Sequence, residues 1–96
     1  MAGHSIITAS GLLGVEDKPQ RIYGFVLQSK AAAAGRVIFH NGDAAADGEI
    51  ARADGVADSQ VVVTYGAGGK FFPDGCYVEI DGNVQYVGID YEQVQS

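Results

Sequence analysis

The sequence is short of the residues that build disulfide, metal or catalytic sites. Cys76 is the only cysteine among 96 residues, so one chain can form neither an internal disulfide nor a thiolate zinc site. Its expected place is an inward-facing strand position, where a thiol behaves as a small hydrophobe. His4 and His40 have no Asp, Ser or Cys beside them at a spacing typical of a catalytic relay or a metal site. We therefore expect no catalytic, cofactor-binding or metal-binding residue, with His40 ending a strand on the solvent side and His4 in a loose terminus.

Positive charge is also scarce. The chain has 6 Lys and Arg against 12 Asp and Glu, and its formal net charge is −6. Nucleic acids and anionic membranes attract positively charged surfaces, so we expect neither as a partner. No apolar run approaches the roughly 18 to 20 residues that cross a bilayer, and the first residues do not form a signal peptide. These absences predict a protein that is made and kept, or assembled, in a cytosol.

Tryptophan is absent and proline occurs twice, whereas glycine occurs 14 times. Glycines spread along the chain without a triplet period are typical of an all-β domain with many turns and exclude collagen. The stretch 29–35 has helical propensity but is too short for an autonomous helix, so we expect a loop. The length suits a single domain over 1–96 with a thin core, in which residues 1–19 form an arm or a first strand.

Short β-prone runs separated by turn signals cover the rest of the chain. Their spacing of about 8–12 residues is typical of a sandwich or barrel with about seven or eight strands. Gly24, inside the run 20–29, predicts a bulge or a close backbone approach. The other expected strands are 4–9, 36–40, 48–53, 59–65, 76–80 and 84–91. The predicted core consists of Val37, Phe39, Val61, Val63, Cys76, Val78, Val87 and Ile89.

The last quarter of the chain carries the strongest local signal. The runs 76–80 and 84–91 are rich in β-branched and aromatic residues and flank residues 81–83, which predicts a β-hairpin. With a two-residue loop at 82–83, Val78 lies opposite Val87 on one apolar face. The outer face of this hairpin would carry Tyr77, Glu79, Tyr86 and Asp90.

Three other groups of residues have weak functional signals. The stretch 66–70 is rich in glycine and ends in lysine, but it lacks the spacing of a phosphate-binding loop, so we expect a surface loop. The acidic residues of 41–43 and 47–49 lie in turns and do not match the spacing of an EF-hand. Exposed tyrosines are candidates for contacts with a sugar or with another protein.

The order of these elements resembles small all-β virion structural proteins of tailed bacteriophages. The resemblance covers roughly residues 20 to 92 and rests on 21–27, 34–42, 71–78 and 84–91, a succession of strands, a small-residue loop and glycine turns. It implies a jelly-roll-like antiparallel β-sandwich without enzymatic activity, present in many copies on a virion assembled in the host cytoplasm.

The function expected from this resemblance is structural. We expect a capsid decoration or cement protein, or a knob-like accessory, that binds a phage capsid or tail protein as an oligomer. The alternative is a carbohydrate-binding β-sandwich module that uses exposed tyrosines.

Residues 22–27 are apolar on both alternating faces, which predicts self-association. A strand of a thin sandwich has one core face and one outer face. Unless something covers them, the residues that lie outside would be either Ile22 and Val26 or Tyr23, Phe25 and Leu27. Identical chains usually form closed symmetric assemblies, and the resemblance favours a trimer over a dimer. The competing explanation is that Leu12 and Leu13 fold back over the strand. The expected interface residues are Ile22, Tyr23, Phe25, Leu27, Tyr77 and Tyr86.

Overall fold

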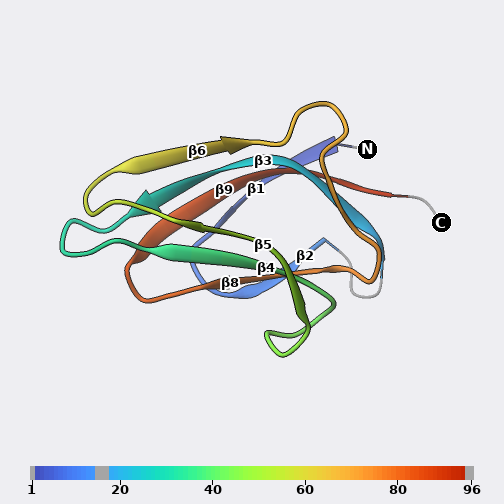
Figure 1. Cartoon of the computed structure of the whole chain (residues 1–96), viewed down its shortest axis with the longest axis horizontal. Helices are drawn as coiled ribbons and strands as arrows, with labels where there is room; N and C mark the ends of the chain where they lie inside the picture. The colour runs from blue at the N-terminus through green and yellow to red at the C-terminus, as the bar shows by residue number, and fades with distance from the viewer. Residues whose placement is uncertain (1, 15–17, 95–96) are drawn as a thin grey trace.

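The computed structural model describes residues 2–14 and 18–94, which form nine strands in two antiparallel sheets (Figure 1). Sheet A has the order β1 (Ala2–Ile7), β9 (Val84–Gln93), β3 (Gln20–Ser29) and β6 (Gln60–Thr64), and β7 (Lys70–Phe72) also pairs with β3. Sheet B has the order β2 (Gly11–Leu13), β8 (Cys76–Ile80), β4 (Arg36–Asn41) and β5 (Gly48–Asp54). The expected all-β sandwich is confirmed, and β2 and β7 are strands that the sequence analysis did not predict.

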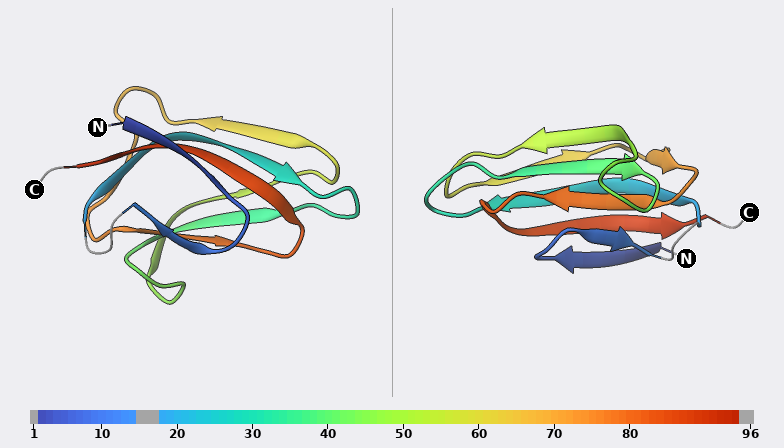
Figure 2. Two further views of the ribbon diagram at one scale, coloured as in Figure 1. Left: turned by 180° about the vertical axis from the view of Figure 1, so that it is seen from behind. Right: turned by 90° about the horizontal axis from the view of Figure 1, so that it is seen from below.

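The strand order is that of a jelly roll. β4 pairs with β5, β3 with β6, β2 with β8 and β1 with β9, so the two halves of the chain form one long antiparallel ribbon. The ribbon is wound so that β3 also pairs with β9, and β4 with β8. Figure 2 shows the result: β1 and β2 lie at one side of the sandwich, and β5 and β6 lie at the other. An eight-stranded double sheet wound in this way is a jelly roll, to which β7 is a short addition.

The predicted hairpin at the end of the chain is wrong. β8 belongs to sheet B and β9 to sheet A, so the two strands face each other across the core instead of pairing. The turn between them is closed by Asp81, whose carbonyl accepts from the Val84 N–H at 3.3 Å. The predicted burial was nevertheless correct, because Val78 and Val87 both point into the core. Alternation of apolar residues decides which side chains are buried, but it does not decide which strand is the neighbour.

The bulge predicted at Gly24 is present. Against β9, the pairing steps from Ile22 opposite Tyr91 to Gly24 opposite Asp90, so Tyr23 is an extra residue on β3. An extra residue resets the alternation of side chains. Ile22 and Phe25 consequently both point into the core, at 0% and 3% exposure.

This bulge corrects the expectation that one apolar set of β3 lies outside. Ile22, Phe25 and Leu27 are all buried in the core, whereas Tyr23 and Val26 are half-buried. Leu13 is also buried in the core from β2, and Leu12 is exposed.

The core lies between the sheets and contains three phenylalanine rings in contact. The Phe39 ring centre lies 4.9 Å from that of Phe25 and 6.3 Å from that of Phe72. Six of the predicted core residues are buried, and Val61 and Val63 are half-buried against them. The buried apolar residues absent from the prediction are Leu13, Ile22, Phe25, Leu27, Phe72 and Val84.

The fold predicts the cost of a cavity at Ile89, which is fully buried. Ile89→Ala should lower the free energy of unfolding by about 2–5 kcal/mol, because burial is lost and a cavity remains. Gln85→Ala, at an exposed position of the same strand, should change it by less than about 0.5 kcal/mol. Urea unfolding of both variants measures the difference, and equal effects would contradict this placement.

Candidate functional site

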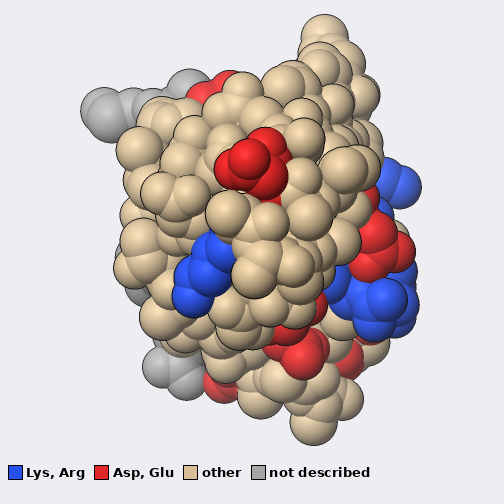
Figure 3. Space-filling view, turned by 90° about the vertical axis from the view of Figure 1, so that its left-hand side faces the viewer, with Lys and Arg blue, Asp and Glu red and all other residues tan. Residues whose placement is uncertain are grey.

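The outer face of sheet B is charged, and its charges are paired with one another. The Arg36 Nε lies 2.6 Å from Asp54 Oδ1, and the Arg52 Nε lies 2.7 Å from Glu49 Oε2. The Glu49 carboxylate beside Arg52 has its pKa lowered by that hydrogen bond. In the end-on view of Figure 3, acidic and basic side chains adjoin each other at the right-hand margin. Groups already paired within the chain have little charge left to offer to a partner.

The outer face of sheet A is different, because apolar residues of its four main strands are aligned across it. The pairing register aligns Ile6 of β1, Gly88 of β9, Val26 of β3 and Val62 of β6. Ile6 is 65% exposed and Val62 is 66% exposed, while Val26 is half-buried. We call these four residues the sheet A row. Phe71 of β7, in the same sheet, is 42% exposed.

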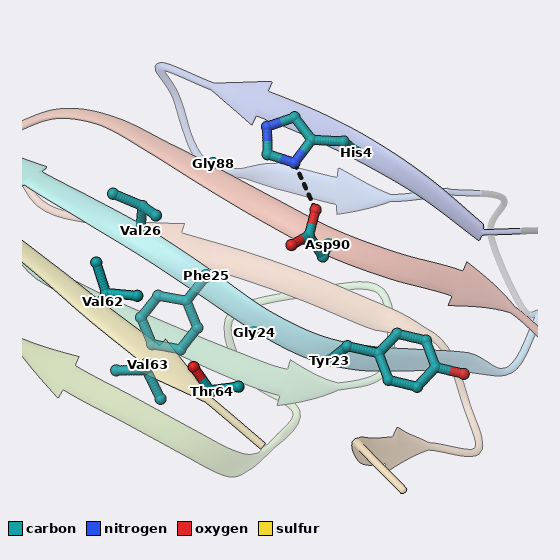
Figure 4. Close-up of a pocket in the computed structure, with 10 residues that line it drawn as sticks. All are labelled: His4, Tyr23, Gly24, Phe25, Val26, Val62, Val63, Thr64, Gly88 and Asp90. Atoms are coloured by element: carbon teal, nitrogen blue, oxygen red, sulfur yellow. Dashed lines mark hydrogen bonds and ion pairs between the residues drawn. The ribbon is translucent and has the colours of Figure 1, made fainter. Parts of the chain in front are cut away.

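A shallow depression of about 110 Å³ lies beside the sheet A row (Figure 4). Gly24 and Gly88 have no side chains and form its floor. His4 stands at its rim, with Nδ1 2.7 Å from Asp90 Oδ1. His4 therefore belongs to a paired strand, which corrects its expected place in a loose terminus.

The His4 and Asp90 pair lacks a neighbouring nucleophile in this depression. Two lining residues carry a hydroxyl, Tyr23 and Thr64. The Tyr23 hydroxyl donates to Glu92, and Thr64 is on β6, with β9 and β3 between that strand and β1. Strands are spaced by about 4.8 Å, whereas a relay requires contact within roughly 3.2 Å. The depression consequently does not have the geometry of an acyl-transfer site formed by His4 and Thr64.

His40 is the second histidine for which the expectation was wrong, because it is only 6% exposed. Its Nδ1 lies 2.8 Å from the Asp47 carbonyl oxygen, and its Nε2 lies 2.7 Å from Glu79 Oε1. A carbonyl can only accept, so Nδ1 donates to Asp47. The Tyr77 ring lies beside the imidazole at a tilt, with 6.2 Å between the ring centres. His40 thus ties β4 to β8 and to the 42–47 loop, a structural role.

The acidic turns also hold the chain together. Asp47 Oδ2 accepts from the backbone N–H groups of Asp43 and Ala44 at 2.9 Å and 3.0 Å. Asn41 exchanges two hydrogen bonds with Asp74. Among residues 2–14 and 18–94, no group of three or more His, Cys, Asp or Glu side chains is placed to hold a metal ion.

The glycine-rich stretch 66–70 is a tight turn. Gly66 and Gly69 have positive φ angles of 77° and 62°, a region in which glycine is favoured. The Gly68 carbonyl accepts a hydrogen bond from Arg21 Nη1 at 2.7 Å. Lys70 points over the Tyr65 ring, with Nζ 5.6 Å from its centre.

The tyrosines proposed as a joint surface do not lie together. Tyr77 is on β8 of sheet B, and Tyr86 is on β9 of sheet A, so they belong to opposite sheets. The Tyr86 hydroxyl accepts from Gln60 Nε2 at 2.9 Å, and the Tyr23 hydroxyl donates to Glu92 Oε1 at 2.7 Å. That hydrogen bond raises the pKa of Tyr23 and lowers that of Glu92. With Ile22, Phe25 and Leu27 in the core, the six expected interface residues do not form one surface.

Comparisons with protein-family models, with curated proteins and with solved structures gave no match for this chain. Within the described ranges, there is also no helix with the length and apolarity needed to span a membrane. The sheet A row is the candidate site, because Ile6 and Val62 are apolar and exposed. Sequence reasoning missed it because its members come from four strands, and only the pairing register aligns them.

The contact between His40 and Glu79 predicts a stability effect at a half-buried position. Glu79→Ala should lower the free energy of unfolding by about 1–3 kcal/mol, because it leaves the buried Nε2 of His40 without its partner. Glu79→Gln keeps a hydrogen-bonding oxygen at this position and should cost less. Chemical unfolding of both variants measures this, and a cost below about 0.5 kcal/mol for alanine, as at an ordinary surface position, would contradict it.

Cys76 is fully buried, and its burial raises the pKa of the thiol to about 12. An unfolded cysteine ionises near pH about 8.5. The folded state keeps the thiol proton up to a higher pH than the unfolded state does. The free energy of unfolding should therefore fall as the pH rises from about 8.5 to 12.

The same burial predicts an unreactive thiol at pH 8. Ellman's reagent should label the folded protein slowly and the urea-unfolded protein at once, because the thiolate is the reacting species. Fast labelling without urea would contradict the buried position.

Proposed function

We propose that this protein is a non-enzymatic structural component of a bacteriophage particle, a decoration, cement or knob-like accessory protein. It binds a capsid or tail protein through the sheet A row and acts as an oligomer. The proposal combines the resemblance in strand and turn order with the fold and with the chemistry of the two outer faces.

The fold supports this proposal without assigning it. Jelly rolls form viral capsid proteins, and they also form lectin domains and cupins. One fold serves many functions, so the chemistry of the surface distinguishes among them better than the fold does.

The observation that carries the proposal is the contrast between the two outer faces. Exposed apolar side chains on one face of a protein can mark an interaction surface. Ile6 and Val62 supply such side chains on sheet A, whereas Arg36 and Arg52 on sheet B are paired within the chain. An apolar strip on a chain of net charge −6 suits a protein partner with a matching apolar patch.

The carbohydrate-binding alternative has less support. A sugar platform requires aromatic rings presented side by side, and Tyr77 and Tyr86 lie on different sheets. A glycan array tests it directly: reproducible binding that is lost in Tyr77→Ala or Tyr86→Ala would favour the alternative over the particle role.

The particle role predicts that the chain is present in purified virions of the phage that encodes it. Mass spectrometry of gradient-purified particles should find it in many copies. Particles lacking the protein should bind the purified chain when it is added back, as measured by co-sedimentation. Absence from particles in cells that express the chain would overturn the proposal.

The binding face is tested with two matched lysine substitutions. Ile6→Lys places a charge in the sheet A row and should weaken co-sedimentation at least tenfold. Leu12→Lys alters an exposed apolar residue on sheet B, at 39% exposure, and should leave co-sedimentation unchanged. Equal effects would move the binding surface away from sheet A.

A further inference from the structure

β6 is an outer strand of sheet A, with one paired neighbour, β3, among the described strands. The Tyr65 N–H donates to the Tyr23 carbonyl, and the Ser29 N–H donates to the Ser59 carbonyl. Antiparallel pairs alternate between bonded and non-bonded positions. The odd-numbered residues of β6 therefore bond to β3, and Gln60, Val62 and Thr64 direct their backbone N–H and C=O groups away from the sheet.

This edge lacks the devices that usually prevent strands from pairing. Native edge strands are commonly blocked by charged side chains, proline or bulges. Residues 59–65 contain no charged residue and no proline, and the pairing of β6 with β3 has a continuous register. By contrast, β5, the outer strand of sheet B, carries Glu49, Arg52 and Asp54 and has a register shift against β4.

The same side of the sandwich is only partly closed. β5 and β6 lie on this side (Figure 2), and the apolar side chains that they direct toward the core are only half-buried. On β6 and just after it, these residues are Val61, Val63 and Tyr65; on β5, they are Ile50, Ala51 and Ala53.

We propose that two copies of this chain pair through their β6 strands, antiparallel and around a two-fold axis at Val62. In this register Val62 faces Val62 of the second copy, and Gln60 faces Thr64. The outward N–H and C=O groups of all three residues then find partners. Val61 faces Val63 on the inner side, so half-buried valines cover each other.

A two-fold axis brings the same surface of both copies together. The charges of this surface are compatible with such pairing. Each copy has a net charge of −6, but the paired stretch is uncharged, so no carboxylates are forced together there. The register also places Asp58 of one copy opposite Gly66 of the other, one residue beyond Tyr65, and Lys70 Nζ lies 5.6 Å from the centre of the Tyr65 ring. This pairing would bring an acidic and a basic side chain into the same region at both ends of the paired strands.

The inference rests on the proposed function only for the expectation that the chain self-associates. It replaces the trimer implied by the resemblance with a dimer, because pairing of two identical antiparallel edges consumes both of them. The sheet A rows of the two copies then meet at Val62.

A symmetric disulfide tests the register. Facing residues in a bonded antiparallel pair have Cα atoms about 5.5 Å apart, within the range of about 4.4–6.8 Å for a disulfide. Val62→Cys should give a cross-linked dimer under mild oxidation, at least tenfold faster than Ile6→Cys. Ile6 is the matched control, because it lies in the same row with nearly the same exposure, on the opposite edge. Equal rates would overturn the register.

A proline substitution tests the association itself. The Val62 N–H points away from β3, so Val62→Pro should fold, as prolines on exposed strand edges do, and should lose the dimer. Light scattering should give twice the 10.0 kDa of one chain for the native protein and 10.0 kDa for Val62→Pro, with circular dichroism confirming that the variant is folded. A native protein that stays monomeric at submillimolar concentration, or a folded Val62→Pro that stays dimeric, would overturn the inference.

These outcomes separate the inference from the particle role. A dimer that does not bind particles keeps the inference and removes the proposed function. A monomer that co-sediments with particles does the reverse.

Discussion

The close approach of the Gly24 backbone to β6 is the constraint on which much of the structure depends. A Cβ atom at this position would lie 2.7 Å from the Val63 carbonyl oxygen, closer than side-chain and backbone atoms approach each other. Glycine therefore permits the bulge at Tyr23. The bulge turns Ile22 and Phe25 to the same side, and the core gains both.

The same glycine shapes the outer surface. Where Gly24 and Gly88 lack side chains, sheet A has a depression instead of a covered face, and the neighbouring Val26 and Val62 stand at its border. Core and candidate site thus share one cause: a residue without a side chain at the middle of the central strand. β3 can bear this because it is paired with β9 on one side and with β6 and β7 on the other.

Polar side chains have a different role from the apolar core. Most of those that are buried hold loops or strands in place. Ser29 Oγ accepts from the Gly35 N–H at 3.0 Å, and the Gly55 N–H donates to the Gly35 carbonyl, so two loops at one end of the sandwich are fixed together. His40 does the same near the other end through Asp47 and Glu79. These groups and the ion pairs of sheet B are satisfied inside the chain. The surfaces that remain for a partner are mainly the sheet A row and the open edge of β6.

The sequence by itself determined the fold class, the position of most strands and the inward side of β8 and β9, because alternation and turn residues act over a few neighbouring residues. It also marked Gly24 as the site of a bulge or of a close backbone approach. It could not determine that β8 and β9 belong to different sheets, since the alternation is identical for a hairpin and for two strands facing each other across a core. Nor could it place His40 beside Glu79, or Ile6 in line with Val62. Those neighbours lie far apart in the chain, and only the winding of the whole ribbon, driven by burial of apolar area on both sheets, brings them together.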